Sequence, residues 1–150
     1  MRPAIPDAAD RPIVVRTDFS DDAAWRTVTT ALKAPASDLL ELDHIFVDDP
    51  LWAGARADEV RAAAPALNEG VVYLADATTM RAPHPLLAVC TATGAETRWS
   101  FLNEHRTEFR VLPGGLVDVS ANLSIANMAF AEFAAMAVAD PDGWYRGIYA

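Results

Sequence analysis

The first half of the chain alternates short apolar runs with segments of helical spacing. The apolar runs, rich in β-branched residues, cover residues 13–15, 45–47 and 71–75. Between the first two runs, Trp25, Val28 and Leu32 recur at spacings of three and four residues, the period of one helical face. A shorter helix is predicted over residues 57–64. Strands that alternate with helices in this way predict an α/β domain with parallel strand pairing.

Polar residues indicate where the first of these helices begins and ends. Ser20 is of a type that commonly caps a helix N-terminus, and Asp21 and Asp22 then occupy the first turn, where the helix dipole favours acids. Pro35 ends the helix. The sequence therefore predicts a helix that begins next to Ser20, with the Ser20 hydroxyl bonded to an amide of the first turn.

The second half departs from the alternation. Residues 86–89 predict a fourth strand, and residues 108–112 and 116–120 flank Pro113-Gly114-Gly115, which is typical of a β-hairpin turn. Asn127 can cap a last helix. One face of that helix is apolar and carries Phe130, Phe133, Ala134 and Ala137. The aromatic residues 144–149 predict a short edge strand.

The predicted fold class is therefore α/β, with α+β as the alternative. We expect a mixed, largely parallel sheet with helices packed on it and a C-terminal β-hairpin plus helix. At 150 residues, 52% of them hydrophobic, the chain can fill one core. Residues 1–12 hold three prolines and predict a flexible N-terminal tail, which leaves residues 13–150 as a single domain.

Charge and cysteine content exclude several classes of partner. A net charge of −9 repels phosphate backbones, so we expect no binding to nucleic acid, and it equally disfavours an anionic membrane surface. No apolar run approaches the roughly 20 residues that cross a bilayer, and the first residues form no apolar leader. A cytoplasmic location is expected. Cys90 is the single cysteine, so no internal disulfide can form.

Aspartates follow three of the predicted strands: Asp18 the first, Asp48 and Asp49 the second, and Asp76 the third. In a parallel sheet these residues, with Thr17 and Phe19, line one edge, where open α/β sheets place ligands. Two interpretations remain open. The carboxylates cap turns and helices, or Asp18, Asp76 and one of the other two converge on a hard cation such as Mg²⁺.

Two sets of candidate site residues follow. A catalytic set would use Asp18 and Asp76 as bases, with Arg16 or Arg110 as a clamp for an anionic substrate. A partner-binding set comes from residues 34–55, which hold five acids and no Lys or Arg. It comprises Asp38, Glu41, Asp43, Asp48 and Asp49, together with the adjacent Trp52. No cofactor or metal motif is present in the sequence.

Four segments carry a resemblance to a known family. They are RTDFSDD at 16–22, VDDP at 47–50, EFRVLP at 108–113 and NLSIANM at 122–128. They resemble a family of small, mostly actinobacterial proteins classed as a domain of unknown function, over about residues 13–149. The resemblance implies one intact domain and no activity. Residues 91–108 are longer here than in that pattern, and such a loop, anchored by Trp99 and Phe101, could cover the aspartate edge.

Two functions fit these observations. The first is a non-catalytic interaction or regulatory module, of the kind that immunity proteins represent, which binds a basic protein. The alternative is a small cofactor-independent enzyme, an isomerase, cyclase or hydrolase of a small molecule. The absence of catalytic motifs favours the first.

Overall fold

The computed structural model describes residues 2–6, 11–34, 43–64, 70–91, 107–125 and 127–147. In chain order its elements are β1 (Ile13–Arg16), α1 (Asp22–Lys33), β2 (Ile45–Val47), the 3-10 turn η1 (Pro50–Trp52), α2 (Ala57–Ala63), β3 (Val71–Ala75), β4 (Leu86–Cys90), β5 (Glu108–Val111), the 3-10 turn η3 (Pro113–Gly115), α4 (Leu116–Ser124), α5 (Phe130–Ala139) and β6 (Trp144–Tyr145).

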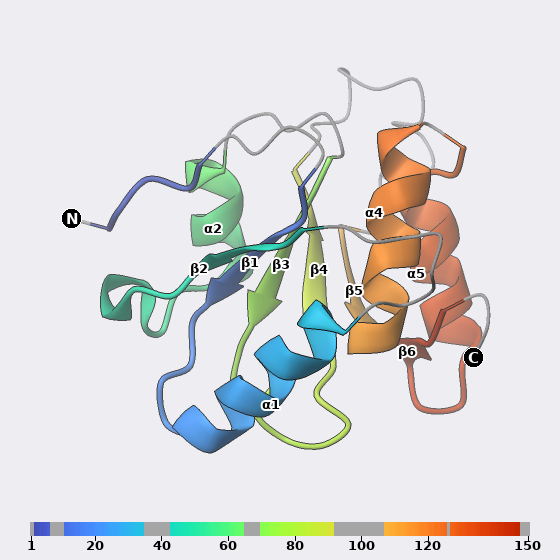
Figure 1. Cartoon of the computed structure of the whole chain (residues 1–150). Coiled ribbons are helices and arrows are strands. Elements are labelled where there is room, and N and C mark those ends of the chain that lie inside the picture. The colour runs from blue at the N-terminus through green and yellow to red at the C-terminus, as the bar shows by residue number, and fades with distance from the viewer. Residues whose placement is uncertain are drawn as a thin grey trace.

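The described strands form one mixed sheet in the order β2-β1-β3-β4-β5-β6 (Figure 1). β1 pairs in parallel with both β2 and β3, β4 is antiparallel to β3 and β5, and β6 is parallel to β5. The α/β class and the largely parallel sheet are thus confirmed. Because β4 runs the other way, its end at Cys90 lies at the edge opposite to the ends of β1, β2 and β3.

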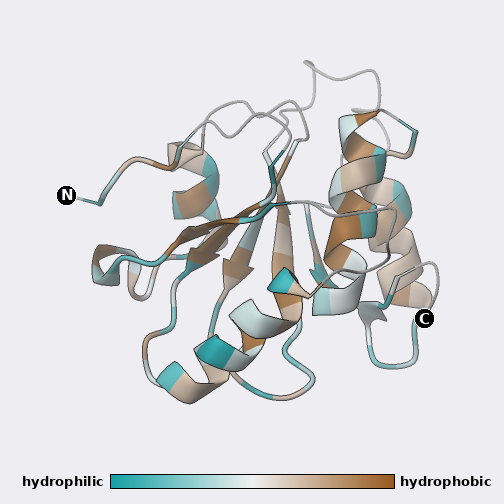
Figure 2. Cartoon of the chain, in the orientation of Figure 1, coloured by the Kyte–Doolittle hydropathy of each residue, from teal (hydrophilic) through white to brown (hydrophobic). Residues whose placement is uncertain are grey.

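Both faces of the sheet are covered, by different helices. Val14 and Tyr73 belong to a buried cluster that includes side chains of α1, α4 and α5. Val15, one position on, belongs to a second cluster with Trp52 of η1 and Val60 of α2. The central strands are apolar on both faces for this reason, as the brown strands in Figure 2 show. The core of the domain therefore surrounds β1 and β3.

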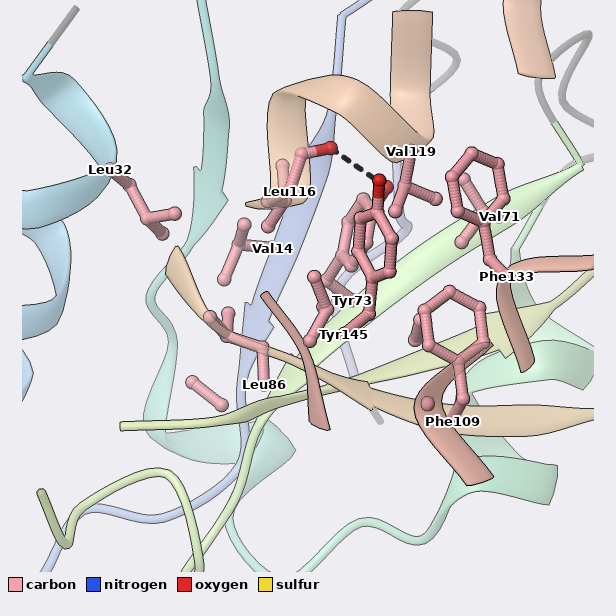
Figure 3. Close-up of a cluster of buried hydrophobic side chains, with 14 of the residues drawn as sticks. Val14, Leu32, Val71, Tyr73, Leu86, Phe109, Leu116, Val119, Phe133 and Tyr145 are labelled. Carbon is pink, nitrogen blue, oxygen red and sulfur yellow. Dashed lines mark hydrogen bonds between the residues drawn. The ribbon is translucent and has the colours of Figure 1, made fainter. Parts of the chain in front are cut away.

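One buried hydrogen-bonded group interrupts the larger cluster. The Tyr73 hydroxyl lies 2.7 Å from the Ser120 hydroxyl. It also lies 3.5 Å from the Leu116 carbonyl oxygen, the contact that Figure 3 marks with a dashed line. Tyr73 and Ser120 are fully buried, so this pairing keeps both hydroxyls from being left unsatisfied in the core. The contact fixes α4 over the centre of the sheet.

Helix α1 begins and ends where the sequence predicts, and its apolar face carries Trp25, Val28 and Leu32. The predicted cap is wrong by one residue. Asp21 is the N-cap, and its side chain accepts a hydrogen bond of 2.9 Å from the amide of Ala24. The Ser20 hydroxyl instead donates to Asp18 Oδ1 at 2.5 Å. The Asp21 carboxylate lies one position closer to the helix than the Ser20 hydroxyl and therefore caps it instead.

These contacts predict different costs for two neighbouring substitutions. Asp21→Ala removes the side-chain cap of α1 and should lower the free energy of unfolding by about 1 kcal/mol. Ser20→Ala removes only an exposed hydroxyl contact and should cost clearly less. Urea denaturation of both variants measures the difference. An equal loss in the two would contradict the assignment of Asp21 as the cap.

The predicted C-terminal hairpin is wrong. Residues 113–115 form η3, and the segment expected to return as a strand is helix α4. Leu116 and Val119 recur at helical spacing and enter the core, while Asp118 occupies the first turn, where the helix dipole favours an acid. Packing of this face on the sheet outweighs the β-propensity of the valines. The partner of β5 is instead β6, the predicted edge strand.

The last helix is confirmed, but its predicted cap is not. α5 buries Phe130, Phe133, Ala134 and Ala137, as the spacing indicates. Its N-cap is Ala129, which makes no side-chain cap. Asn127 lies outside the helix, and its side-chain amide donates to Asn122 Oδ1 at 2.8 Å. It therefore joins the end of α4 to the loop before α5.

Candidate functional site

The ends of β1, β2 and β3 open on one edge of the sheet, as the predicted topology requires. Backbone contacts join the loops that follow them. The amides of Thr17 and Asp18 donate to the Ala75 carbonyl at 2.9 and 3.3 Å, and the Gly54 amide donates to the Thr17 carbonyl at 2.8 Å. Thr17, Asp18 and the loops after β2 and β3 therefore lie side by side, in agreement with the expected common edge.

Arg16, the last residue of β1, organises this edge. Its side chain is only 6% exposed. Nη2 donates to Asp22 Oδ1 at 2.7 Å, and Nη1 donates to Asp48 Oδ1 at 3.3 Å. Nε donates to the Asp18 carbonyl oxygen at 3.0 Å. One buried guanidinium thus joins the loop after β1, the start of α1 and the loop after β2.

Two aromatic rings complete the surroundings of this guanidinium. Its central carbon lies 4.3 Å from the ring centroid of Phe19 and 5.2 Å from that of Trp25. The Trp25 indole N–H donates to Asp48 Oδ2 at 3.1 Å. Arg16 is therefore held from several directions by the protein itself, and the predicted role as a clamp for a substrate anion finds no support in these contacts.

Five aspartates surround Arg16 or adjoin those that bind it, and we call them the acidic cluster: Asp18, Asp21, Asp22, Asp48 and Asp49. Three of them anchor the local backbone through Oδ1. Asp18 accepts from the Ser20 amide, Asp21 from the Ala24 amide and Asp49 from the Leu51 amide, each at 2.9 Å. The capping interpretation of the strand-end aspartates is thus correct for Asp18 and Asp49. Within the described residues, Oδ2 of these three side chains has no hydrogen-bond partner.

Asp76 belongs to a second group on the same edge. Its two carboxylate oxygens accept from Nη1 and Nη2 of Arg110, both at 2.8 Å, and Oδ1 also accepts from the Thr79 amide at 3.2 Å. Burial, the largest single influence, opposes ionisation of Asp76. The hydrogen bonds and the charge of Arg110 together with Thr79 outweigh it, so the pKa of Asp76 lies below its ordinary value of 3.8. A carboxylate held in this way is a weak general base.

This ion pair predicts how stability depends on pH. Because the pKa of Asp76 is lower in the folded state, the pair contributes stability above pH 3.8, and this contribution is lost as the pH falls through the folded value. Arg110→Met should leave burial as the dominant influence and raise the pKa of Asp76. Carboxyl carbon NMR titration measures it.

Arg56→Met is the matched control for that titration, because the ion pairs of Arg56 within the described residues are with the exposed Asp58 and the partly exposed Glu59. The control should leave the titration of Asp76 unchanged. An Asp76 titration that Arg110→Met leaves unaltered would contradict the role of the Arg110 pair.

His84 is a further residue of this edge, and it is not among the candidates predicted from the sequence. Its backbone has a φ of 67°, unusual for a residue other than glycine, and its ring Nδ1 lies 2.9 Å from the Thr79 carbonyl oxygen. A carbonyl only accepts, so Nδ1 carries the proton in this contact. Its position between two prolines was the one signal in the sequence.

The second of the two interpretations, convergence of the strand-end carboxylates on a cation, is not what the described residues show. Asp76 is bound to Arg110, Asp48 to Arg16 and Trp25, and Asp18 and Asp49 cap separate turns. Within the described residues, no three His, Cys, Asp or Glu side chains are grouped so that they could hold a metal ion. The chemistry of this edge is therefore that of fixed ion pairs and caps.

The structure also separates the predicted partner-binding residues. Asp38 and Glu41 lie outside the described residues, as do Trp99 and Phe101 of the predicted cover. Asp43 is exposed and accepts from Arg11 Nη2 at 3.0 Å.

Trp52, expected as an exposed contact residue in one interpretation, is only 1% exposed and packs in the cluster under α2. With residues 2–6 in place, the indole is therefore not part of the exposed acidic surface. Of the acids in residues 34–55, Asp48 and Asp49 are the ones that the described residues place at the edge formed by the ends of β1, β2 and β3.

Comparisons with known proteins give one match. A family model described as "Domain of unknown function (DUF6924)" matches residues 11–148. Neither the curated proteins nor the solved structures provide a match to the chain. Among the described residues, no helix has both the length and the apolar character needed to cross a membrane.

Proposed function

The chain belongs to this family, and we propose that it acts as a non-catalytic binding module that presents the acidic cluster to a basic protein partner. The observation that carries the proposal is the anchoring of Asp18, Asp21 and Asp49 through one carboxylate oxygen each. The second oxygen of each is available to a donor from outside. A regulatory or immunity-type role is the form of activity that such a module would have.

Fixed carboxylates favour association for a specific reason. A flexible acidic side chain loses conformational entropy when a partner binds it, whereas a side chain already held by a backbone amide loses less. Asp22 and Asp48 are held in a similar way by Arg16. The cluster carries five negative charges against the one buried positive charge of Arg16, which favours encounter with a basic surface.

The same contacts give little support to the enzyme alternative. Its proposed base Asp76 has a lowered pKa and is held by Arg110, and its proposed clamp Arg16 is occupied by protein acceptors. General bases that work near neutral pH usually have raised carboxyl pKa values. Binding without chemistry accounts for these pairs directly. With a net charge of −9 we further expect no affinity for nucleic acid, and we place the module in the cytoplasm.

A triple substitution that keeps the caps but removes the charge tests the proposal. Asn caps turns and helices about as well as Asp, so Asp18→Asn, Asp21→Asn and Asp49→Asn together should leave the fold intact. Proteins captured from the source cells by the wild-type chain are purified, and their dissociation constants are measured by calorimetry. We expect a basic partner whose affinity falls about tenfold in the triple variant and also falls between about 50 and 200 mM salt.

The matched control removes the same charge elsewhere. Asp58→Asn, Glu132→Gln and Asp142→Asn change the net charge equally at exposed positions away from the acidic cluster. This variant should bind the partner within about twofold of wild type. If both triple variants weaken partner binding equally, net charge alone explains the effect, and the acidic cluster is not the binding surface. A partner that binds the Asp18, Asp21 and Asp49 variant as tightly as wild type would do the same.

A further inference from the structure

Residues 2–6, which we call the arm, pack on the domain although the sequence predicts a flexible tail over residues 1–12. The Arg2 guanidinium forms an ion pair with Glu59 and donates from Nε to the Leu51 carbonyl oxygen at 3.1 Å. Its central carbon lies 5.3 Å from the ring centroid of Trp52. Ile5 is 5% exposed and belongs to the buried cluster that contains Trp52. The arm is thus held at two points three residues apart.

These contacts combine charge recognition with apolar anchoring, as peptide-binding sites do. We give the name arm site to the groups of the domain that contact the arm. The Glu59 carboxylate, the Leu51 carbonyl and the Trp52 ring contact Arg2, and the buried cluster that contains Trp52 receives Ile5. A charged side chain meets a carboxylate, a carbonyl and an aromatic face, and an aliphatic side chain is buried beside them. Glu59 is itself fixed, because its Oε1 accepts from the Arg56 amide at the start of α2. Its pKa is lowered, most strongly by the hydrogen bond from Arg2.

Two observations separate the arm from the domain that receives it. The family model begins at residue 11, whereas the groups of the arm site all lie within the matched residues 11–148. The domain therefore provides the site, and a segment outside the domain fills it. In addition, the Trp52 indole N–H is buried without a hydrogen-bond acceptor among the described residues. Neither Arg2 nor Ile5 supplies an acceptor to this donor.

We propose that the arm site is a peptide-recognition site, occupied here by the chain's own arm, for an extended segment of a partner protein with an arginine followed three residues later by an aliphatic residue. The arm acts as an intramolecular competitor. A short tether holds such a competitor at an effective concentration in the millimolar range, so a partner must bind more tightly than the arm to displace it. This site uses none of the residues of the acidic cluster, and either proposal can fail without the other.

A peptide supplied from outside tests the competition. The probe is the acetylated, amidated peptide Arg-Pro-Ala-Ile-Pro, which corresponds to residues 2–6, and its binding to the full chain is measured by calorimetry. Arg2→Glu places like charges at Glu59 and should release the arm. We expect the peptide to bind this variant at least about tenfold more tightly than wild type. Adding Glu59→Gln to Arg2→Glu should weaken that binding about tenfold again, because the peptide arginine loses its carboxylate.

Arg11→Glu is the matched control, since it makes the same charge change near the start of the chain but affects the pair with Asp43. It should bind the peptide no better than wild type. Equal peptide binding to wild type, Arg2→Glu and Arg11→Glu would overturn the proposal. Loss of the far-ultraviolet helical signal in Arg2→Glu would also overturn it, because the arm would then be a structural part of the domain. Dimers formed by exchange of arms between two wild-type chains would assign the site to a second copy instead.

Discussion

Replacement of Gly115 by alanine is expected to lower the free energy of unfolding by about 3 kcal/mol. A Cβ at Gly115 would lie 2.9 Å from the backbone nitrogen of Gly147 and 3.1 Å from the carbonyl carbon of Arg146. Backbone atoms cannot rotate away as a side chain can, so either α4 or the segment after β6 must shift. β6 consists of two residues at the edge of the sheet, with its described ladder to β5 alone. We therefore expect β6 to yield first and Tyr145 to leave the core.

Gly114 provides the control one residue away. A Cβ there meets nothing within 4 Å, and its backbone does not adopt the positive φ that disfavours other residues. Gly114→Ala should leave stability unchanged or raise it by up to about 1 kcal/mol, because alanine restricts the unfolded chain. Urea denaturation of both variants, with tyrosine and tryptophan fluorescence, measures the contrast. Similar stability of the two variants would show that the approach of β6 to η3 is not tight.

Elements whose hydrophobic pattern matches their final environment could be predicted from the sequence. β3 and the first three residues of β1 are continuous apolar runs because both faces of these strands are buried, and α1 shows one apolar stripe because one of its faces is buried. The shared edge of Asp18 and Asp76 followed from the same reasoning, since parallel neighbours end together. Local pattern and tertiary position agree at these places, and this agreement is what made the predictions succeed.

Elements decided by contacts distant in the sequence were missed. Helix α4 contains β-branched residues after two glycines, and its packing on Tyr73 and the sheet decides for a helix over the predicted strand. The composition of the arm predicts a disordered tail, yet Arg2 has partners more than 40 residues away, as the Arg2–Leu51 and Arg2–Glu59 contacts show. The sequence could predict that Arg16 pairs with an acid, because an arginine in a strand usually does. It could not predict that the Arg16 guanidinium is buried, and this burial is what lets it join the loops of the edge.

Arg16→Met is expected to lower the free energy of unfolding by about 2 to 3 kcal/mol. The methionine can fill part of the volume of the arginine stem, so the loss reports mainly the three hydrogen bonds from the guanidinium and its contacts with Phe19 and Trp25. The partners Asp22 and Asp48 have side chains 75% and 45% exposed, so water can solvate both carboxylates after the substitution. The cost is therefore smaller than that of leaving a buried charge unpaired.

Arg56→Met separates this effect from the loss of an ordinary surface ion pair. The Arg56 side chain is 74% exposed, and its pairs with Asp58 and Glu59 should contribute no more than about 1 kcal/mol. The two variants lose the same formal charge, so their difference in urea denaturation measures what burial adds at Arg16. A similar cost for both would mean that the edge is held by backbone contacts alone. In that case the acidic cluster would keep its shape without Arg16, and a basic partner that depends on the cluster would bind Arg16→Met at least as tightly as wild type.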